Sequence, residues 1–157
     1  MLETLQQPFA QTDYWGWIHG DITSAGVKRI ISQMARWEAD PNAHIHIHFF
    51  SEGGEVCAGI DLYEYFKAYP RKLTVYAGTA NSIAAVAFLG APNREVSKSA
   101  RFILHSVVST LTPKATIKEL EQAVASASFN DNRVESILKE HIRLEPSHVS
   151  GQLKPAR

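Results

Sequence analysis

The chain has 157 residues, a length that suits a single domain, and 45% of them are hydrophobic, which is enough for a packed core. Its 16 Lys and Arg residues balance its 16 Asp and Glu residues. Because no net positive charge exists to attract phosphate groups, nucleic acids and anionic membranes are not expected as partners.

The N-terminal segment has no basic start followed by an apolar run, so we expect no signal peptide. No stretch approaches the ~18 apolar residues that a membrane span needs. The single cysteine, Cys57, excludes an intrachain disulfide and, in its apolar context, is expected to be a small core residue. We therefore expect a soluble protein of the cytoplasm.

Strand-like and helix-like hydrophobic patterns alternate along the chain. In chain order, we predict a strand at 14–18, a helix at 27–37, a strand at 43–50, a helix at 56–68, a strand at 73–77, a helix at 82–89, a strand at 101–104 and a long helix from about 116 to 142. Thr116 and Glu119 give the long helix a capping-box start. This alternation predicts βαβ units and a largely parallel sheet, with functional loops at the carboxyl ends of the strands.

Ser82 follows the predicted strand at 73–77 and begins a helix of small residues. A helix N-terminus leaves backbone N–H groups unpaired, and its dipole favours negative charge. The N–H of Ile83 could therefore hold an oxyanion that forms beside Ser82. The alternative is that Ser82 is only the N-cap of this helix.

A nucleophilic serine needs a base, and His105 is the candidate. It stands at the end of the predicted strand at 101–104, which leaves room after Ser82 for one helix and one strand to return to the same sheet edge. The alternative for His105 is a hydrogen-bonded structural histidine.

Gly53 and Gly54 follow the predicted strand at 43–50. Glycine tolerates positive φ and lets a ligand approach the backbone closely. The N–H groups of these glycines could complete an oxyanion hole. The alternative is an ordinary turn between a strand and a helix.

Three segments resemble the proteolytic subunits of the Clp protease family. Segment 51–63 (Ser-Glu-Gly-Gly-Glu-Val-Cys-Ala-Gly-Ile-Asp-Leu-Tyr) is similar to the family's Ser-Pro-Gly-Gly loop and the helix after it. Segment 78–85 (Gly-Thr-Ala-Asn-Ser-Ile-Ala-Ala) resembles its Gly-x-Ala-Ala-Ser-Met-Gly-Ala nucleophile segment, and segment 101–105 (Arg-Phe-Ile-Leu-His) resembles its Arg-x-Met-Ile-His strand. The segments follow in the family's order and spacing, and the resemblance covers roughly residues 14–145.

The resemblance implies a crotonase-like (Clp-type) α/β fold of repeated ββα units with a long handle helix. It implies one domain over residues 1–157, with a head at 14–113, a handle helix at 114–143 and a truncated or atypical tail at 144–157.

The resemblance also assigns roles to the site residues. Ser82 is the implied nucleophile and His105 the implied base. Gly54 and Ile83 are the implied oxyanion-hole donors, and Gly53 lies with them in the substrate-binding loop. The implied activity is that of a serine endopeptidase that cleaves unfolded proteins through an acyl-enzyme, with peptides as substrates and no cofactor.

By the same resemblance, the chain assembles with itself into a ring, a heptamer or a double heptamer, joined through the handle helix. The sequence contains no Gly-x-x-x-x-Gly-Lys-Ser/Thr segment, so it has no P-loop to bind ATP. A separate AAA+ ATPase unfoldase is therefore the expected partner.

The sequence departs from the family pattern in three ways. Glu52 stands where the family has a loop proline, and Asn81 stands where it has an alanine. Segment 144–157 contains no aspartate to serve as the triad acid, and Glu145, its one carboxylate, falls too early. Exchange of that acid for an amide lowers turnover about 10⁴-fold in a serine protease, so a Ser–His pair alone would be slow.

Two other functions stay open. The missing acid favours a non-catalytic Clp-like subunit that serves assembly or peptide holding. Segment 57–62 (Cys-Ala-Gly-Ile-Asp-Leu) resembles the oxyanion loop of acyl-CoA hydratases and isomerases of the crotonase superfamily. The chain is much shorter than those enzymes, and Ser82 and His105 would be idle in one.

His44, His46 and His48 alternate along the predicted strand at 43–50, so their imidazoles share one face. Three imidazoles could bind zinc. Because no carboxylate-rich segment accompanies them, we expect no metal, and a histidine face that a neighbouring helix or subunit covers.

Overall fold

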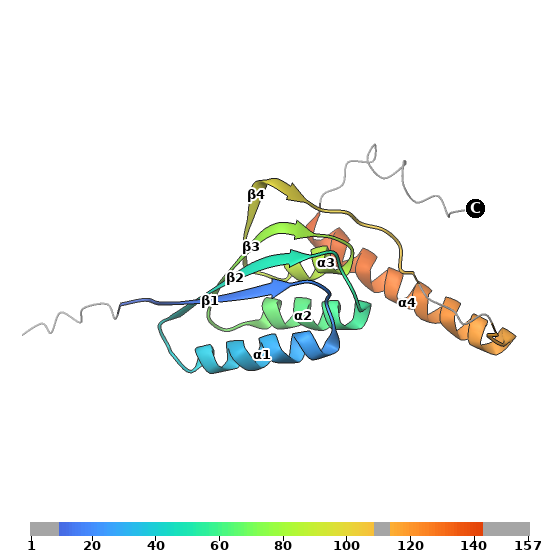
Figure 1. The fold of residues 1–157 in the computed structure, drawn as a ribbon, viewed down its shortest axis with the longest axis horizontal. Coiled ribbons are helices and arrows are strands. Elements are labelled where there is room, and N and C mark those ends of the chain that lie inside the picture. The colour runs from blue at the N-terminus through green and yellow to red at the C-terminus, as the bar shows by residue number, and fades with distance from the viewer. Residues whose placement is uncertain (1–9, 109–113, 143–157) are drawn as a thin grey trace, which may run out of the picture.

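The structure, a computed structural model, describes residues 10–108 and 114–142. These residues form a parallel four-stranded sheet in the order β1-β2-β3-β4, with four helices (Figure 1). The strands are β1 (Thr12–His19), β2 (Ala43–Ser51), β3 (Lys72–Ala80) and β4 (Asn93–Arg101). The helices are α1 (Ser24–Glu38), α2 (Val56–Ala68), α3 (Ile83–Leu89) and α4 (Ile117–His141).

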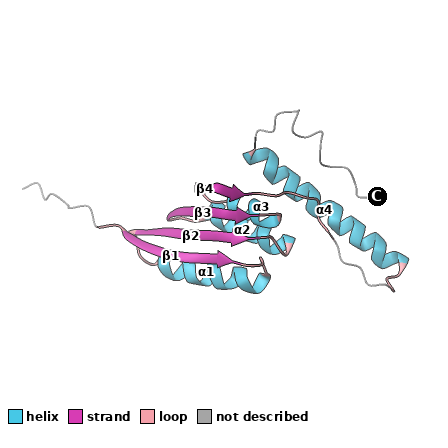
Figure 2. Ribbon diagram, turned by 45° about the horizontal axis from the view of Figure 1, so that its top comes forward, coloured by secondary structure: helices cyan, strands magenta, loops and turns pink. Residues whose placement is uncertain are grey.

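The predicted βαβ units and parallel sheet are confirmed, because α1, α2 and α3 each connect one strand to the next. Figure 2 shows these three helices on one face of the sheet. The core lies between that face and the helices, and Ile45, Ile47 and Phe49 of β2 point into it, fully buried. The alternate residues of β2, the histidines, point to the other face.

The predicted strand at 101–104 is wrong. The fourth strand is β4, which ends at Arg101, and residues 102–108 follow it without regular secondary structure. β4 is polar and almost wholly exposed at the edge of the sheet, so it lacks the apolar alternation by which a strand is found in a sequence. The apolar run at 102–104 belongs instead to the segment that passes the end of β3.

The expectation that Cys57 is a core residue is also wrong. Cys57 lies in the first turn of α2 with its side chain exposed. The neighbouring Ala58 and Gly59 face the core in its place. An apolar sequence context therefore did not identify which side of this helix is buried.

α4 has a packed half and a free half. Near its end, Ile137 is buried, the Tyr63 hydroxyl lies 2.9 Å from Nε2 of His141, and Lys67 Nζ lies 2.8 Å from Oε1 of Glu140. Its first half carries exposed apolar side chains and extends away from the sheet in Figure 1. These side chains are Ile117, Leu120, Val124 and Phe129. The end of α4 thus packs on the core, and its first half has exposed apolar residues of the kind expected for a contact between copies.

The capping box expected at the start of α4 is confirmed, because Thr116 and Glu119 each bond the other's backbone N–H. Within residues 10–108 and 114–142, no helix is both long and apolar enough to cross a membrane.

Two strand valines test the position of the core. Val75 of β3 is fully buried, whereas Val96 of β4 is 58% exposed. Val75→Ala should lower the free energy of unfolding by about 2–3 kcal/mol, because it removes two buried methyl groups and leaves a cavity. Val96→Ala should change it by less than about 0.5 kcal/mol. Denaturant unfolding of both variants measures the difference, and equal losses would contradict the burial of Val75 and the exposure of Val96.

Candidate active site

Ser82 lies in the turn that joins β3 to α3, at the carboxyl end of the sheet. Its φ is 54° and its ψ is −130°, and it is the one non-glycine residue with positive φ in the described part of the chain. Such backbone strain costs about 1–3 kcal/mol and persists only where the surrounding structure enforces it. The side chain makes no N-cap hydrogen bond, so capping does not explain the serine. A serine on a sharp strand-to-helix turn is the arrangement that exposes a nucleophilic hydroxyl.

Gly53 packs directly against Ser82. A Cβ added to Gly53 would lie 2.8 Å from Cβ of Ser82 and 3.3 Å from its Oγ, and Gly53 also has a φ of 118°. Both the contact and the conformation therefore require glycine. The structure thus brings the two predicted loops, one after β2 and one after β3, into contact at the serine.

Two backbone N–H groups beside Ser82 have no backbone acceptor among the described residues. They belong to Gly54 and Ile83. By contrast, Gly53 donates its N–H to Oγ of Ser51 at 3.2 Å, and the N–H groups of Ala84 and Ala85 go to backbone carbonyls. The two free donors are the ones expected for an oxyanion hole.

The glycine loop is held in place by the start of α1. Ile22 N–H donates to the Gly53 carbonyl at 2.7 Å, and Glu55 N–H donates to the Ile22 carbonyl at 2.8 Å. The Glu55 carboxylate also accepts from the N–H and hydroxyl of Ser24 in the first turn of α1. The hydroxyl and then the backbone hydrogen bond lower the pKa of Glu55 below its ordinary value. The loop is therefore fixed independently of any ligand.

The two sequence departures beside the serine, Glu52 and Asn81, bond to each other. Nδ2 of the buried Asn81 donates to Oε2 of Glu52 at 2.6 Å. Arg101 holds the same carboxylate, with Nη2 at 3.2 Å and 3.1 Å from its two oxygens. The network joins the ends of β2, β3 and β4 beside Ser82, and the spacing of its three members in the sequence does not indicate that they meet.

The segment that carries His105 reaches Ser82 through the backbone. Ser82 N–H donates to the Ile103 carbonyl at 2.6 Å, which sets residues 102–105 alongside the turn. The imidazole of His105 is exposed, and its Nδ1 lies 2.7 Å from the Ser106 carbonyl oxygen. Within residues 10–108 and 114–142, no hydrogen bond joins His105 to Ser82. The structure thus brings Ser82, Gly53, Gly54 and Ile83 together and leaves the His105 ring turned toward its own backbone.

Asp131 of α4 is a further residue of this region that the sequence pattern does not indicate. Its Oδ1 accepts from the N–H of Val107 at 2.7 Å, so this carboxylate fastens α4 to the segment after His105. Asp131 lies inside the long helix, where nothing in a helical pattern distinguishes it from a surface residue. Glu145 and the rest of the expected tail at 144–157 lie outside the described residues.

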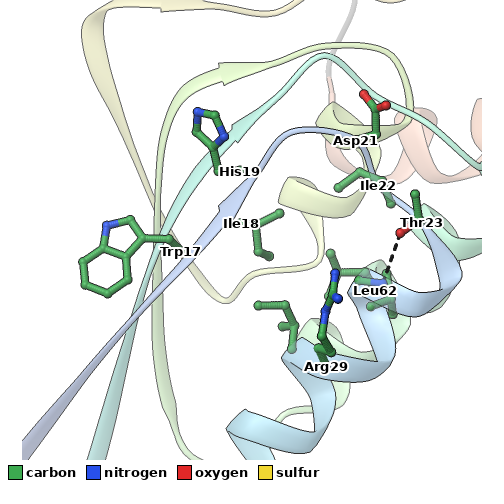
Figure 3. Close-up of a pocket in the computed structure, with 11 residues that line it drawn as sticks. Trp17, Ile18, His19, Asp21, Ile22, Thr23, Arg29 and Leu62 are labelled. Atoms are coloured by element: carbon green, nitrogen blue, oxygen red, sulfur yellow. Dashed lines mark hydrogen bonds between the residues drawn. The ribbon is translucent and has the colours of Figure 1, made fainter.

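A cavity of about 150 Å³ opens beside the glycine loop, between the end of β1, the start of α1 and α2. Figure 3 shows Trp17, Ile18, Asp21, Ile22, Thr23, Arg29 and Leu62 around it. Ser82 does not line this cavity, so the candidate nucleophile faces a different part of the surface.

Comparison with known proteins gives one family and one fold. A family model described as Clp protease matches residues 17–155. Among solved structures, a mutant ClpP1 from Listeria monocytogenes matches with a TM-score of 0.73 and 21% sequence identity, over 87% of this chain and 76% of that chain. A search of curated proteins found no match. The structural likeness confirms the crotonase-like α/β fold predicted from the sequence.

Two glycines with positive φ, Gly20 and Gly53, allow the cost of backbone strain to be measured separately from the cost of a steric clash. Gly20 has a φ of 87° and open space around it, whereas Gly53 has a φ of 118° and touches Ser82. Gly20→Ala should cost about 1–2 kcal/mol of stability from backbone strain alone. Gly53→Ala should cost a further ~1–3 kcal/mol, because the methyl group overpacks the turn. Denaturant unfolding of the two variants tests this, and equal losses would show that the Gly53–Ser82 contact is not tight.

Proposed function

The chain belongs to the Clp protease family, and from that premise we propose that it is a serine endopeptidase that cleaves unfolded proteins through an acyl-enzyme on Ser82. The observation that carries the proposal is the strained φ of Ser82 beside two free backbone donors. The half-buried Ser82 makes no cap hydrogen bond that would require this conformation, whereas a nucleophile on a strained strand-to-helix turn uses it.

The proposed reaction uses groups from three loops. Ser82 Oγ attacks the peptide carbonyl carbon while His105 takes its proton as general base. The N–H groups of Gly54 and Ile83 hold the oxyanion that forms. His105 then gives the proton to the leaving amine, and water hydrolyses the ester that remains on Ser82. The extended substrate lies along the Gly53 and Gly54 backbone by strand addition.

The contact between His105 and Ser106 supplies part of what a triad acid supplies. A carbonyl oxygen only accepts, so Nδ1 of His105 must carry the proton when it bonds the Ser106 carbonyl at 2.7 Å. That tautomer leaves the lone pair on Nε2, the nitrogen that would serve Ser82. A neutral carbonyl stabilises an imidazolium less than a carboxylate does, so we expect turnover below that of a full Ser–His–Asp triad.

Self-assembly is the second part of the proposal. Ile117, Leu120 and Val124 of α4 fall at i, i+3 and i+7, so they share one helix face, and all three are exposed. An apolar stripe on a helix that extends from the body suits contact with another copy of the chain. We propose a ring, a heptamer or double heptamer, of the kind the family resemblance implies, served by a separate AAA+ ATPase unfoldase.

A non-catalytic subunit of the same assembly is the alternative that one observation favours. His105 and Ser82 are not hydrogen-bonded to each other, and the ring of His105 is exposed. Catalytic hydrogen bonds are often loose before substrate binds, so this geometry is compatible with both functions. The acyl-CoA alternative loses support, because the family that matches is the protease.

Labelling with a fluorophosphonate probe separates the two functions. We expect the wild-type chain to be labelled once, Ser82→Ala to be unlabelled, and Ser106→Ala, a serine of the neighbouring segment, to be labelled as the wild type. An unlabelled wild-type chain that is folded and assembled would exclude the nucleophile and favour the non-catalytic subunit.

Replacing the base tests the proposed role of His105. His105→Ala should lower kcat/KM for an unfolded peptide substrate by about 10²–10⁴-fold, the usual contribution of a general base. His48→Ala, on the opposite face of the sheet from the core, should leave kcat/KM unchanged. Equal kcat/KM values for His105→Ala and the wild type would rule out His105 as the base.

A charge on the apolar stripe tests assembly. Val124 is 66% exposed, so Val124→Asp should leave the free energy of unfolding of the chain almost unchanged while it breaks the contact between copies. Ser126→Asp places the same charge on the opposite face of α4 and is the matched control. Sedimentation should show smaller particles for Val124→Asp only. Assemblies of one size for all three proteins would contradict the role given to the stripe.

A further inference from the structure

The face of the sheet opposite the core gathers two histidines and a carboxylate from two strands. Asp13 of β1 and His44 and His46 of β2 each offer a ligand atom within 4.8 Å of the other two. Oδ1 of Asp13 lies 3.2 Å from Nε2 of His46 and 3.7 Å from Nδ1 of His44. The sequence did not reveal this group, because Asp13 lies some 30 residues before the histidines.

Strand register creates the group. β1 and β2 are parallel, and Asp13 stands opposite His44 while Trp15 stands opposite His46. Residues two apart on a strand share a face, so Asp13 and both histidines point to the same side. The Trp15 ring stacks on the His46 ring, with centroids 4.2 Å apart, and shields it from water.

One nitrogen in the group has no partner. His44 is only 7% exposed, yet its Nδ1 makes no hydrogen bond although it points at the Asp13 carboxylate. A buried polar atom without a partner costs about 1–3 kcal/mol, and such atoms are rare in folded proteins. Burial lowers the pKa of His44, helped by His46 and Lys72, which favours the neutral ring whose lone pair can bind a cation.

The far nitrogens of both rings are held by hydroxyl groups of β3. Nε2 of His44 lies 2.8 Å from Oγ1 of Thr74, and Nδ1 of His46 lies 3.0 Å from the Tyr76 hydroxyl. A hydroxyl both donates and accepts, so each ring keeps its orientation whichever nitrogen carries the proton. Metal-binding histidines typically have such a partner on the second nitrogen.

We propose that Asp13, His44 and His46 form a binding site for a divalent transition-metal ion, with zinc as the ion that this ligand set suits best. Imidazole and carboxylate ligands at about 2.0–2.2 Å from a tetrahedral zinc lie about 3.3–3.6 Å from one another. The two distances to Oδ1 of Asp13 already bracket that spacing. The Asp13 side chain is half-exposed, which leaves a route for the ion and a coordination position for water.

One neighbouring charge opposes the ion. Lys72 lies close enough to His44 to lower its pKa, and Lys72 Nζ bonds Oε1 of Gln11 at 3.2 Å. Gln11 Nε2 in turn donates to Oδ1 of Asp13 at 2.7 Å. Both Gln11 and Lys72 are exposed, so they can turn to solvent when an ion enters.

The site is independent of the proposed protease chemistry. It lies in the first half of β1 and β2, whereas Ser82 follows the end of β3. A bound ion would join β1, an edge strand, to its neighbour β2, and so would stabilise the folded chain in proportion to its binding. Its presence can therefore be measured without reference to peptide hydrolysis.

The test is calorimetric titration of the full-length, chelator-treated protein with zinc chloride, with thermal unfolding as a second measurement. We expect one zinc per chain and a higher Tm with zinc. Asp13→Asn and Tyr76→Phe should each weaken zinc binding about 10–100-fold or more, since loss even of a group behind a ligand costs that much. His48→Gln, the next histidine on the same face but outside the group, should bind as the wild type.

Asp13→Asn keeps the size and shape of an exposed side chain, so this variant should fold. It therefore tests the site even if a variant of a buried histidine fails to fold. Failure of the folded wild-type chain to bind zinc would overturn the proposal. So would zinc binding that is unchanged in Asp13→Asn, or that is lost in His48→Gln, because either result would place the metal elsewhere.

Discussion

The contact between Gly53 and Ser82 is the constraint on which the candidate site depends. A side chain on Gly53 would meet Ser82, and both residues have positive φ, so the ends of β2 and β3 fit together only in this conformation. Gly59 extends the same close approach, because a Cβ there would clash with Cγ1 of Ile83. The helices α2 and α3 therefore pack closely beside the two residues, Gly54 and Ile83, whose N–H groups have no backbone acceptor among the described residues.

The network of Glu52, Asn81 and Arg101 explains how this chain keeps that contact with an unusual sequence. A proline at position 52 would restrict the backbone there, whereas Glu52 does not, and its carboxylate accepts hydrogen bonds instead. Asn81 and Arg101 supply them, from the ends of β3 and β4. Because Asn81 is buried and Glu52 is exposed, an amide left without its partner would cost more than a carboxylate left without its partner. The two departures from the family pattern thus bond to each other in this chain.

The hydrophobic spacing of the sequence predicts the elements that pack against the core. In β2 and β3, apolar residues alternate with polar ones or form a continuous apolar run that faces the helices. The helices α1, α2 and α4 carry apolar residues at helical spacing. The predicted bounds of these elements are therefore close to the observed ones. β4 is held by backbone pairing with β3 at an exposed edge, and its charged sequence gives no signal. The turn that carries Ser82 is predictable because a glycine, a serine and a small-residue helix mark it. The environment of His105 is not predictable from the sequence, because it depends on where residues 102–108 contact α4.

β2 has two faces with different chemistry, and the difference has a physical consequence. On one face Ile45, Ile47 and Phe49 meet the helices, and burial alone stabilises them. On the other face His44 and His46 are also buried, each 7% exposed, and burial of an imidazole is favourable only if each nitrogen finds a partner. Three of their four ring nitrogens do so within the sheet, through Thr74, Tyr76 and Asp13. The fourth, Nδ1 of His44, faces the same carboxylate that His46 already uses, and a shared cation satisfies all three groups at once where a single proton cannot.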